Sequence, residues 1–148
     1  MRYQNEVIIK ASRDKVIELF DNPDNLAKWQ KGFVSMELIE GDPGEVGAKH
    51  KMRYKMGKRD VEMIETVTKK DLPNIFSGSY EAKGVYNHID NYFEVVDENT
   101  TKYWSENEFR LKGMMKLMGL IMPGAFKKQT QQYMNDFRDF VEKEVREG

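Results

Sequence analysis

His50 and His88 are the only imidazoles in the 148 residues and the first candidates for chemistry. In the segment 48–56 apolar and basic side chains alternate, so His50 and Tyr54 share the apolar face with Met52. A histidine can act as a general base near neutral pH, and a tyrosine hydroxyl can stabilise an enolate. His50 and Tyr54 are therefore the candidate catalytic residues. Because no Asp or Glu is placed by the sequence to orient His50, a structural role and a polar contact to a ligand both stay open.

The composition argues against a metal site and against nucleic-acid binding. The sequence has no cysteine, so a zinc site would need both histidines and a carboxylate, and the spacing of the histidines matches no ligand motif. We expect no metal site and no cofactor, and we place His88 on the outer face of a sheet. Lys and Arg number 24 and Asp and Glu number 25, whereas a nucleic-acid binder needs a clear excess of base.

A second group of candidate site residues lies in the segments 85–96 and 100–111. Each segment alternates, and one face of each combines apolar side chains with amides. If both faces point inward, they give the mixture of apolar walls and a few polar groups that is typical of small-molecule pockets. The alternative phase places the amides in solvent and Trp104 inside. The residues proposed for the site are Asn87, Asn91, Asn107 and Phe109.

The last part of the chain supplies the opposite wall. Apolar residues recur every three or four positions over 124–146, which predicts a long amphipathic helix. We expect Phe126, Tyr133 and Phe137 to face the sheet from this helix.

The remaining segments predict the elements that position these residues. A strand over 2–10 is followed by Ser12, an expected N-cap, and by a short helix over 13–21. A second short helix carries Leu26 and Trp29. Six further strands joined by tight turns predict an antiparallel meander, with the inward phase of 60–69 and 75–82 left open. The fold class is therefore α+β: about seven antiparallel strands, curved around one long C-terminal helix, in one domain over 1–148. The strands begin at Phe33 and Ala48 and then cover 60–69, 75–82, 85–96 and 100–111.

Four methionines lie in the nine residues before the long helix, among hinge-capable glycines and a proline. Methionine suits adaptable apolar surfaces. Three interpretations stay open: core filling, a mobile portal in which Met118 contacts the ligand, and a transient membrane contact with lysines facing anionic headgroups. The residues concerned are Gly113, Met114, Met115, Met118, Gly119, Met122, Pro123 and Gly124, with Lys112, Lys116, Lys127 and Lys128.

No segment reaches the length of a transmembrane helix. The longest apolar stretch, Met114 to Met122, is interrupted by Lys116 and Gly119, whereas a span needs about 20 residues. The polar residues Met1 to Glu6 resemble no secretory signal, from which we expect a cytoplasmic protein. The sequence does not indicate an oligomeric state.

Five stretches of the chain carry a family resemblance: Ala11 to Phe20, Asn22 to Trp29, Gly44 to Ala48, Phe109 to Gly113 and Pro123 to Thr130. They resemble the START / polyketide cyclase / birch-pollen-allergen-like (SRPBCC) superfamily, in the right order and over essentially the whole chain. The resemblance implies a helix-grip fold and a cavity for a hydrophobic ligand. It implies no single reaction, since that superfamily includes cyclases, lipid carriers, hormone receptors and co-chaperones.

Three functions compete on this basis. The first is the binding or transport of a small hydrophobic or amphipathic ligand (lipid, polyketide-like or aromatic) in an internal cavity. The alternative is a polyketide cyclase/dehydratase-like enzyme that uses the same cavity, with His50 as base. The third is a co-chaperone-type protein-interaction domain that uses the outer basic row of 48–56. The expected ligand-binding residues are His50, Met52, Tyr54, Asn87, Asn91, Asn107, Phe109, Met118, Phe126, Tyr133 and Phe137.

Overall fold

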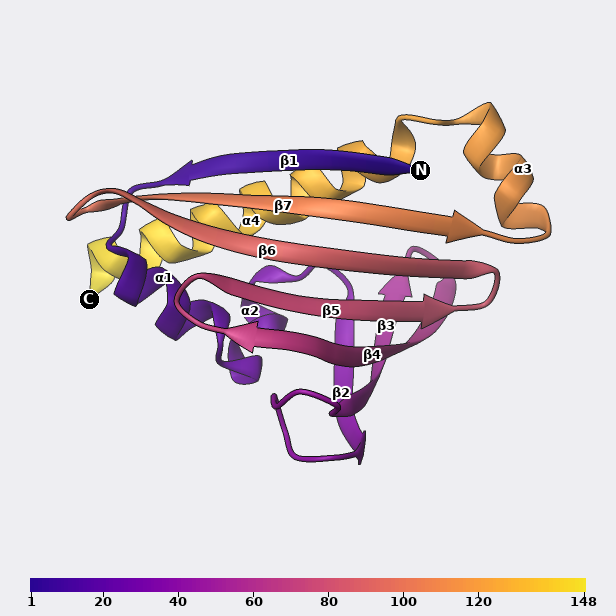
Figure 1. The fold of residues 1–148 in the computed structure, drawn as a ribbon, viewed down its shortest axis with the longest axis horizontal. Helices are drawn as coiled ribbons and strands as arrows, with labels where there is room; N and C mark the ends of the chain where they lie inside the picture. Colours follow the sequence, from indigo (N-terminus) through magenta and orange to yellow (C-terminus); the bar gives the residue numbers. More distant parts are fainter.

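The computed structural model describes residues 1–148 and shows one curved antiparallel sheet that holds a long helix (Figure 1). The strand order is β1-β7-β6-β5-β4-β3-β2, so the first strand of the chain pairs with the last. The strands are β1 (Arg2–Ile9), β2 (Phe33–Glu40), β3 (Lys49–Met56), β4 (Arg59–Asp71), β5 (Ile75–Ala82), β6 (Val85–Asp97) and β7 (Thr100–Leu111). The helices are α1 (Arg13–Phe20), a 3-10 turn (Pro23–Asn25), α2 (Leu26–Trp29), α3 (Met114–Ile121) and α4 (Ala125–Glu147).

This architecture confirms the predicted fold class. Local chemistry sets the helix starts: Ser12 Oγ accepts a hydrogen bond from the Lys15 amide at 3.3 Å, as expected of an N-cap. The Asn22 side chain accepts from the Asp24 amide at 3.0 Å and caps the 3-10 turn. The short helices α1 and α2 both contact α4, which runs along β1 (Figure 1).

Strand register confirms the predicted inward phase of β6 and β7. Asn91, Ser105 and Asn107 are buried on the side that faces α4. Trp104 lies on the outer face, where its ring stacks on Tyr92 with centroids 4.1 Å apart. The alternative phase, with Trp104 inside, is therefore wrong.

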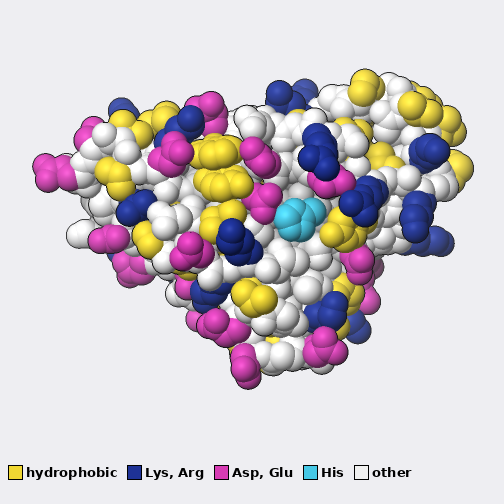
Figure 2. Space-filling view, viewed as in Figure 1, with side chains coloured by type: hydrophobic (Ala, Val, Ile, Leu, Met, Phe, Trp, Pro, Cys, Tyr) yellow, Lys and Arg dark blue, Asp and Glu magenta, His cyan; other side chains and the backbone are white.

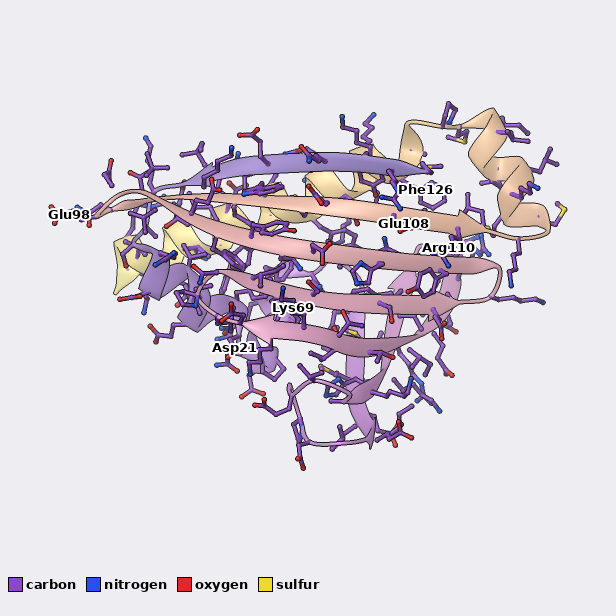
Figure 3. The ribbon with its side chains drawn as sticks, viewed as in Figure 1. Asp21, Lys69, Glu98, Glu108, Arg110 and Phe126 are labelled. Carbon is purple, nitrogen blue, oxygen red and sulfur yellow. The ribbon has the colours of Figure 1, made fainter.

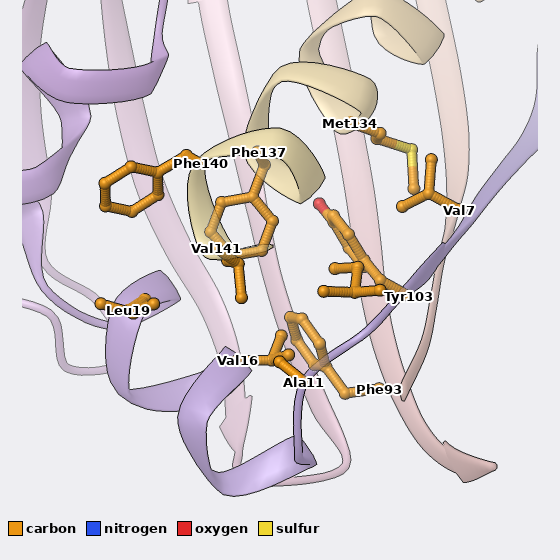
Figure 4. Packing of buried hydrophobic residues seen from close by; sticks show 11 residues of the cluster. Val7, Ala11, Val16, Leu19, Phe93, Tyr103, Met134, Phe137, Phe140 and Val141 are labelled. Atoms are coloured by element: carbon orange, nitrogen blue, oxygen red, sulfur yellow. The ribbon is translucent and has the colours of Figure 1, made fainter. Parts of the chain in front are cut away.

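The apolar core fills the space between α4, α1 and the β1, β6 and β7 strands (Figure 4). Phe137 of α4 is fully buried at its centre. Its ring meets Trp29 at 5.0 Å, and meets Phe20 and Tyr103 both at 5.7 Å between centroids. These edge-to-face contacts fix α4 against α1, α2 and β7.

The segment before α4 differs from the prediction, because it contains the helix α3 (Met114–Ile121), which the sequence analysis did not assign. Methionine and leucine have high helix propensity and make up five of the eight residues of α3, which forms a helix although Gly119 lies within it. Met114, Met118 and Met122 are exposed, and only Met115 of the four methionines is half-buried. Core filling is therefore wrong for three of the four methionines.

Candidate functional site

A row of paired residues crosses the inner face of the sheet from β3 to β6. His50 lies opposite Glu65, Glu65 opposite Tyr80, and Tyr80 opposite Asn87. Each residue comes from a different strand, so the antiparallel register alone brings the four side chains together. The row continues to Phe109 of β7.

His50 and Glu65 form the centre of this row. Nδ1 of His50 lies 3.1 Å from Oε1 of Glu65, and the residues are 3% and 8% exposed. The ring is not aligned for a hydrogen bond at this distance, so Nδ1 has no hydrogen-bond partner. The hydroxyl of Tyr80 donates to Oε2 of Glu65 at 2.7 Å. The sequence analysis found no acidic residue to orient His50; that expectation is wrong, because Glu65 reaches it across the strands.

The carboxylate defines what His50 can do. Although Nδ1 and Oε1 are not aligned for a hydrogen bond, an ionised carboxylate at this distance attracts a proton and repels a ring lone pair. A proton on Nδ1 is therefore favoured electrostatically, and Nε2 is left as an acceptor. Desolvation by burial, together with the hydrogen bond to the negatively charged Glu65, raises the pKa of Tyr80 well above its ordinary value. Tyr80 therefore stays protonated and continues to donate to Glu65.

Tyr54 lies far from His50, whereas the sequence analysis expected the two residues to act together. At about 3.3 Å of rise per residue, the Cα atoms of His50 and Tyr54 are roughly 13 Å apart along β3. The Tyr54 hydroxyl donates to Oε1 of Gln30 at 2.6 Å, so its single proton is already engaged. Burial raises the pKa of Tyr54. The two candidate catalytic residues therefore do not form one catalytic pair, and Glu65 and Tyr80 are the nearer partners of His50.

The inward amides bond mainly to the protein itself. Asn87 Nδ2 donates to Oδ1 of Asn107 at 3.2 Å, and Asn107 Nδ2 donates to Ser105 Oγ at 3.3 Å. Asn91 accepts from the Tyr103 hydroxyl at 2.7 Å and donates to the carbonyl oxygen of Phe76 at 3.2 Å. These bonds satisfy polar groups that would otherwise be costly to bury.

Aromatic residues form the wall where α4 begins. Figure 3 shows Phe126 near the N-terminal end of β1. Its ring lies 4.7 Å from that of Phe109, which stacks on Tyr3 at 5.9 Å. The Tyr3 hydroxyl shares a 2.7 Å hydrogen bond with Thr130, which ties β1 to α4. Burial raises the pKa of Tyr133, another half-buried residue of α4.

The remaining predicted site residues lie elsewhere. Met52 and Phe137 are almost fully buried among protein atoms, while Met118 is exposed on α3. Other inward-facing side chains keep some exposed surface. They are Tyr80, Asn87, Phe109, Phe126 and Tyr133.

Two hollows lie mainly on the outer face of the sheet. Their volumes are about 600 Å³ and 370 Å³, and their walls are mostly polar. Outward residues of β1 and β7 line both hollows, with Trp104 in the larger one and His88 in the smaller. These hollows therefore do not correspond to the internal apolar cavity that the sequence analysis expected.

His88 lies on the outer face, as predicted. Its Nε2 is 3.2 Å from Thr68 Oγ1, and its Nδ1 is 4.0 Å from Asp90. No group of three or more acidic or histidine side chains is arranged to hold a metal ion. No helix is long and apolar enough to cross a membrane.

The outer basic row of β3 is partly neutralised. Glu62 of β4 lies 3.4 Å from Arg53 and 3.9 Å from Lys51. Lys49 donates to Thr66 at 3.1 Å. The two contacts of Glu62 reduce the free positive charge available for a protein partner on this face.

Glu65, Tyr80 and Gln30 are the site residues that sequence reasoning missed. The sequence contained one signal for Glu65. It lies on the same face of its strand as Val61, Met63 and Val67, and an acidic residue is unusual on such an apolar face. Its partner was not readable, because the pairing of β3 with β4 joins residues distant in sequence.

A curved antiparallel sheet that grips one long helix, with a polar row on its inner face, defines a helix-grip protein. The chain belongs to the family described as polyketide cyclase / dehydrase and lipid transport, whose model matches residues 1–142. This finding confirms the resemblance to the START / polyketide cyclase / birch-pollen-allergen-like superfamily.

Solved structures share the fold at low sequence identity. A conserved protein from Geobacillus kaustophilus matches with a TM-score of 0.80 and 18% identity, over 97% of this chain and 96% of that chain. The ZhuI aromatase/cyclase from Streptomyces sp. R1128 matches at 0.79 and 10% identity, over 98% and 95%. Norcoclaurine synthase from Thalictrum flavum, in complex with dopamine and hydroxybenzaldehyde, matches at 0.71 and 19% identity, over 95% and 86%. A search of curated protein sequences finds no match.

Proposed function

We propose that the protein binds a small amphipathic molecule between the inner face of the sheet and α4. The observation that carries this proposal is the pair of His50 and Glu65, a polar centre on an inner face otherwise rich in apolar and aromatic side chains. Apolar walls supply binding free energy through burial, and a few polar groups fix the orientation of the ligand.

The chemistry of the row defines the ligand class. Nε2 of His50 is the acceptor that the Glu65 carboxylate leaves free, so it favours a ligand hydroxyl. The aromatic rings of Phe109, Phe126 and Tyr133 suit a flat ring system. A phenolic or polyketide-like molecule fits both requirements, and the aromatic ligands named for norcoclaurine synthase support this class.

A pair of fluorescent probes tests the proposal. Naphthol carries a hydroxyl donor, and methoxynaphthalene has the same ring system without it. We expect saturable binding of both probes, with naphthol bound about two- to tenfold more tightly, the contribution of one hydrogen bond.

The matched variants are His50→Ala on the inner face and His88→Ala on the outer face. The preference for naphthol disappears in His50→Ala and persists in His88→Ala. Absence of saturable binding, or equal effects of the two variants, would show that the inner face is not the site.

An enzymatic function is the second candidate, and the contact between Glu65 and His50 favours it. In an aldol cyclisation, Nε2 of His50 would take a proton from the carbon beside a ketone. The resulting enolate carbon attacks a second carbonyl of the same molecule, the alkoxide is protonated, and loss of water gives an enone. Glu65 would stabilise the imidazolium that forms.

Heptane-2,6-dione, in which three carbons separate the two carbonyl carbons, is a simple probe, because its cyclisation and dehydration give a methylcyclohexenone that absorbs in the ultraviolet. Catalysis of this reaction that is lost in His50→Ala, and in which Glu65→Gln lowers kcat more than it changes KM, would support the enzyme. Naphthol binding without enone formation in the wild type would favour the binding protein.

A further inference from the structure

The helix α3 exposes more apolar surface than any other short element of the fold. Met114, Leu120 and Ile121 are 77%, 75% and 68% exposed, and Leu117, Met118 and Met122 are also exposed. Figure 2 shows these hydrophobic side chains gathered at the end of the molecule where α3 lies in Figure 1. An apolar group of this kind on a protein surface marks an interaction site.

The packing of α3 explains its exposure. At Gly119 a Cβ would come within 2.5 Å of the Leu111 side chain, so this glycine is the point where α3 meets the end of β7. Met115 packs on Gly84 of the β5–β6 turn. The other side chains of α3 project away from the sheet.

Lysines lie within α3 and on the segments that precede and follow it. Between Phe109 and Asn135 the sequence has five basic residues and no acidic residue, although the whole chain has a formal net charge of −1. Figure 2 shows Lys and Arg side chains next to the hydrophobic ones at this end. The five are Arg110, Lys112, Lys116, Lys127 and Lys128. Arg110 is paired with Glu108 at 3.1 Å, and Lys127 lines the larger outer hollow together with Glu6 and Glu94. Lys112 and Lys116 are therefore the lysines that accompany the apolar residues of α3.

We infer that α3 and its neighbouring lysines dock on an anionic lipid surface. A helix of eight residues is about 12 Å long, so it lies in the interface and does not cross the bilayer. Its apolar side chains enter the boundary between headgroups and acyl chains. The lysines reach the anionic headgroups with their ammonium groups while their stems stay along the apolar surface.

The positive charge beside α3 favours an anionic lipid surface over a second copy of the chain as the partner. A symmetric dimer through α3 would bring the same surface of both copies together. Lys112 and Lys116 of one copy would then face the like-charged lysines of the other, which is unfavourable. An anionic lipid surface instead complements these lysines and covers the apolar residues at the same time.

Docking places the end of β7 and the start of α4 at the lipid surface. Phe109 and Phe126 of the proposed ligand site belong to these same elements. Membrane docking itself does not depend on any ligand, so it can be tested with the protein alone.

Vesicle co-sedimentation tests this inference. The wild-type chain is mixed with vesicles of phosphatidylcholine, with and without phosphatidylserine. We expect binding to the vesicles with phosphatidylserine, weakened by added salt. Lys116→Gln and Lys112→Gln each weaken the binding about fivefold, the contribution of one lysine near an anionic surface.

Matched variants separate the apolar contribution from a general loss of hydrophobicity. Leu120→Asn with Ile121→Asn changes two exposed apolar residues of α3. Val95→Asn with Val96→Asn changes two exposed residues at the far end of β6, each 56% exposed. Both double variants keep the thermal midpoint of the wild type, because all four side chains are exposed. Only the α3 variant loses vesicle binding.

Three results would overturn the inference. They are equal binding to both kinds of vesicle, retained binding in the α3 double variant, and a dimer in analytical ultracentrifugation that this variant dissociates. None of them affects naphthol binding by the free protein, so failure here is distinguishable from failure of the proposed ligand site.

Discussion

Glu65 on β4 places its Oε1 atom 3.1 Å from Nδ1 of His50 on β3, with both side chains buried. This relationship favours one of the two ring nitrogens as the site of the proton. Because the carboxylate only accepts, it favours a proton on Nδ1 and leaves Nε2 to meet a ligand.

Glu65→Gln is expected to reverse the tautomer of His50. The amide of Gln presents an N–H group toward Nδ1, so the ring proton moves to Nε2. Nitrogen chemical shifts of the two ring atoms, measured by NMR at a pH where the ring is neutral, report this change directly. The signals of His88 on the outer face serve as the internal control, and an unchanged His50 tautomer would refute the assignment of Glu65.

The Phe137→Ala variant tests whether α4 is integral to the fold. Phe137 is fully buried against Phe20, Trp29 and Tyr103, so its truncation should lower the free energy of unfolding by about 3–5 kcal/mol. Denaturant titration measures the loss. On the same helix, the exposed Val145 provides a control, since Val145→Ala should cost about 0.5 kcal/mol or less. Equal effects of the two substitutions would show that the helix does not pack as described.

Stability should fall in alkali because of buried tyrosines. Burial raises the pKa of Tyr3 from 10.0 to about 12, with the Thr130 hydrogen bond acting in the opposite direction. Between these values the unfolded chain releases the proton while the folded protein keeps it. The contribution of this group to stability is therefore complete below pH 10 and is lost as the pH rises toward 12.

Denaturant titrations across this range measure the decline, to which Tyr54, Tyr80 and Tyr103, with pKa values also raised by burial, contribute. Tyr3→Phe removes one titrating group and makes the slope of unfolding free energy against pH shallower. A free energy of unfolding that stays constant above pH 10 would contradict this prediction.

Metal chelators should leave the protein unchanged. The chain has no cysteine, and its acidic and histidine side chains form no group that could hold a metal ion. Thermal unfolding and naphthol binding are compared with and without EDTA. A melting temperature that drops with EDTA and recovers with zinc would show that a metal site exists.

The segment 113–124 should exchange its amide hydrogens faster than the strand segments 48–56 and 100–110. The helix α3 packs on little of the sheet, whereas those strands pair on both sides. Hydrogen exchange followed by mass spectrometry measures this difference. Binding of an apolar ligand should slow the exchange if the segment acts as a portal.

Met118→Asp tests the portal in a second way. Met118 is exposed, so the substitution should impair ligand uptake more than it lowers stability. Stopped-flow fluorescence with naphthol gives the rate of uptake, and thermal unfolding gives the stability. If the variant unfolds, Met118 supports the fold and the portal idea is wrong.

The sequence alone determined the elements whose signals are local. The period of two in 85–96 and 100–111 predicted two strands with alternating faces, because alternation reports one buried face. Which face points inward was left open by the sequence, and the burial of Asn91 and Asn107 decides it. The spacing over 124–146 predicted α4 to within one residue at each end. Ser12 marked the start of α1, since a cap depends on neighbouring amides only.

Local signals also had limits. The methionine-rich segment showed hinge-capable residues, but whether it packed in the core or projected outward depended on what lay beside it. The structure places the end of β7, the β5–β6 turn and the Met1 side chain beside α3, and most of its other side chains stay exposed.

Only the tertiary structure showed which residues form the polar row on the inner face of the sheet. His50, Glu65 and Tyr80 lie on three strands, and their contacts depend on the register with which β3 meets β4 and β4 meets β5. A shift of one residue in either register would turn Glu65 or Tyr80 to the other face. The packing of the whole sheet on its helices sets that register, and for this reason the alternation of a single segment revealed His50 but not its partner Glu65.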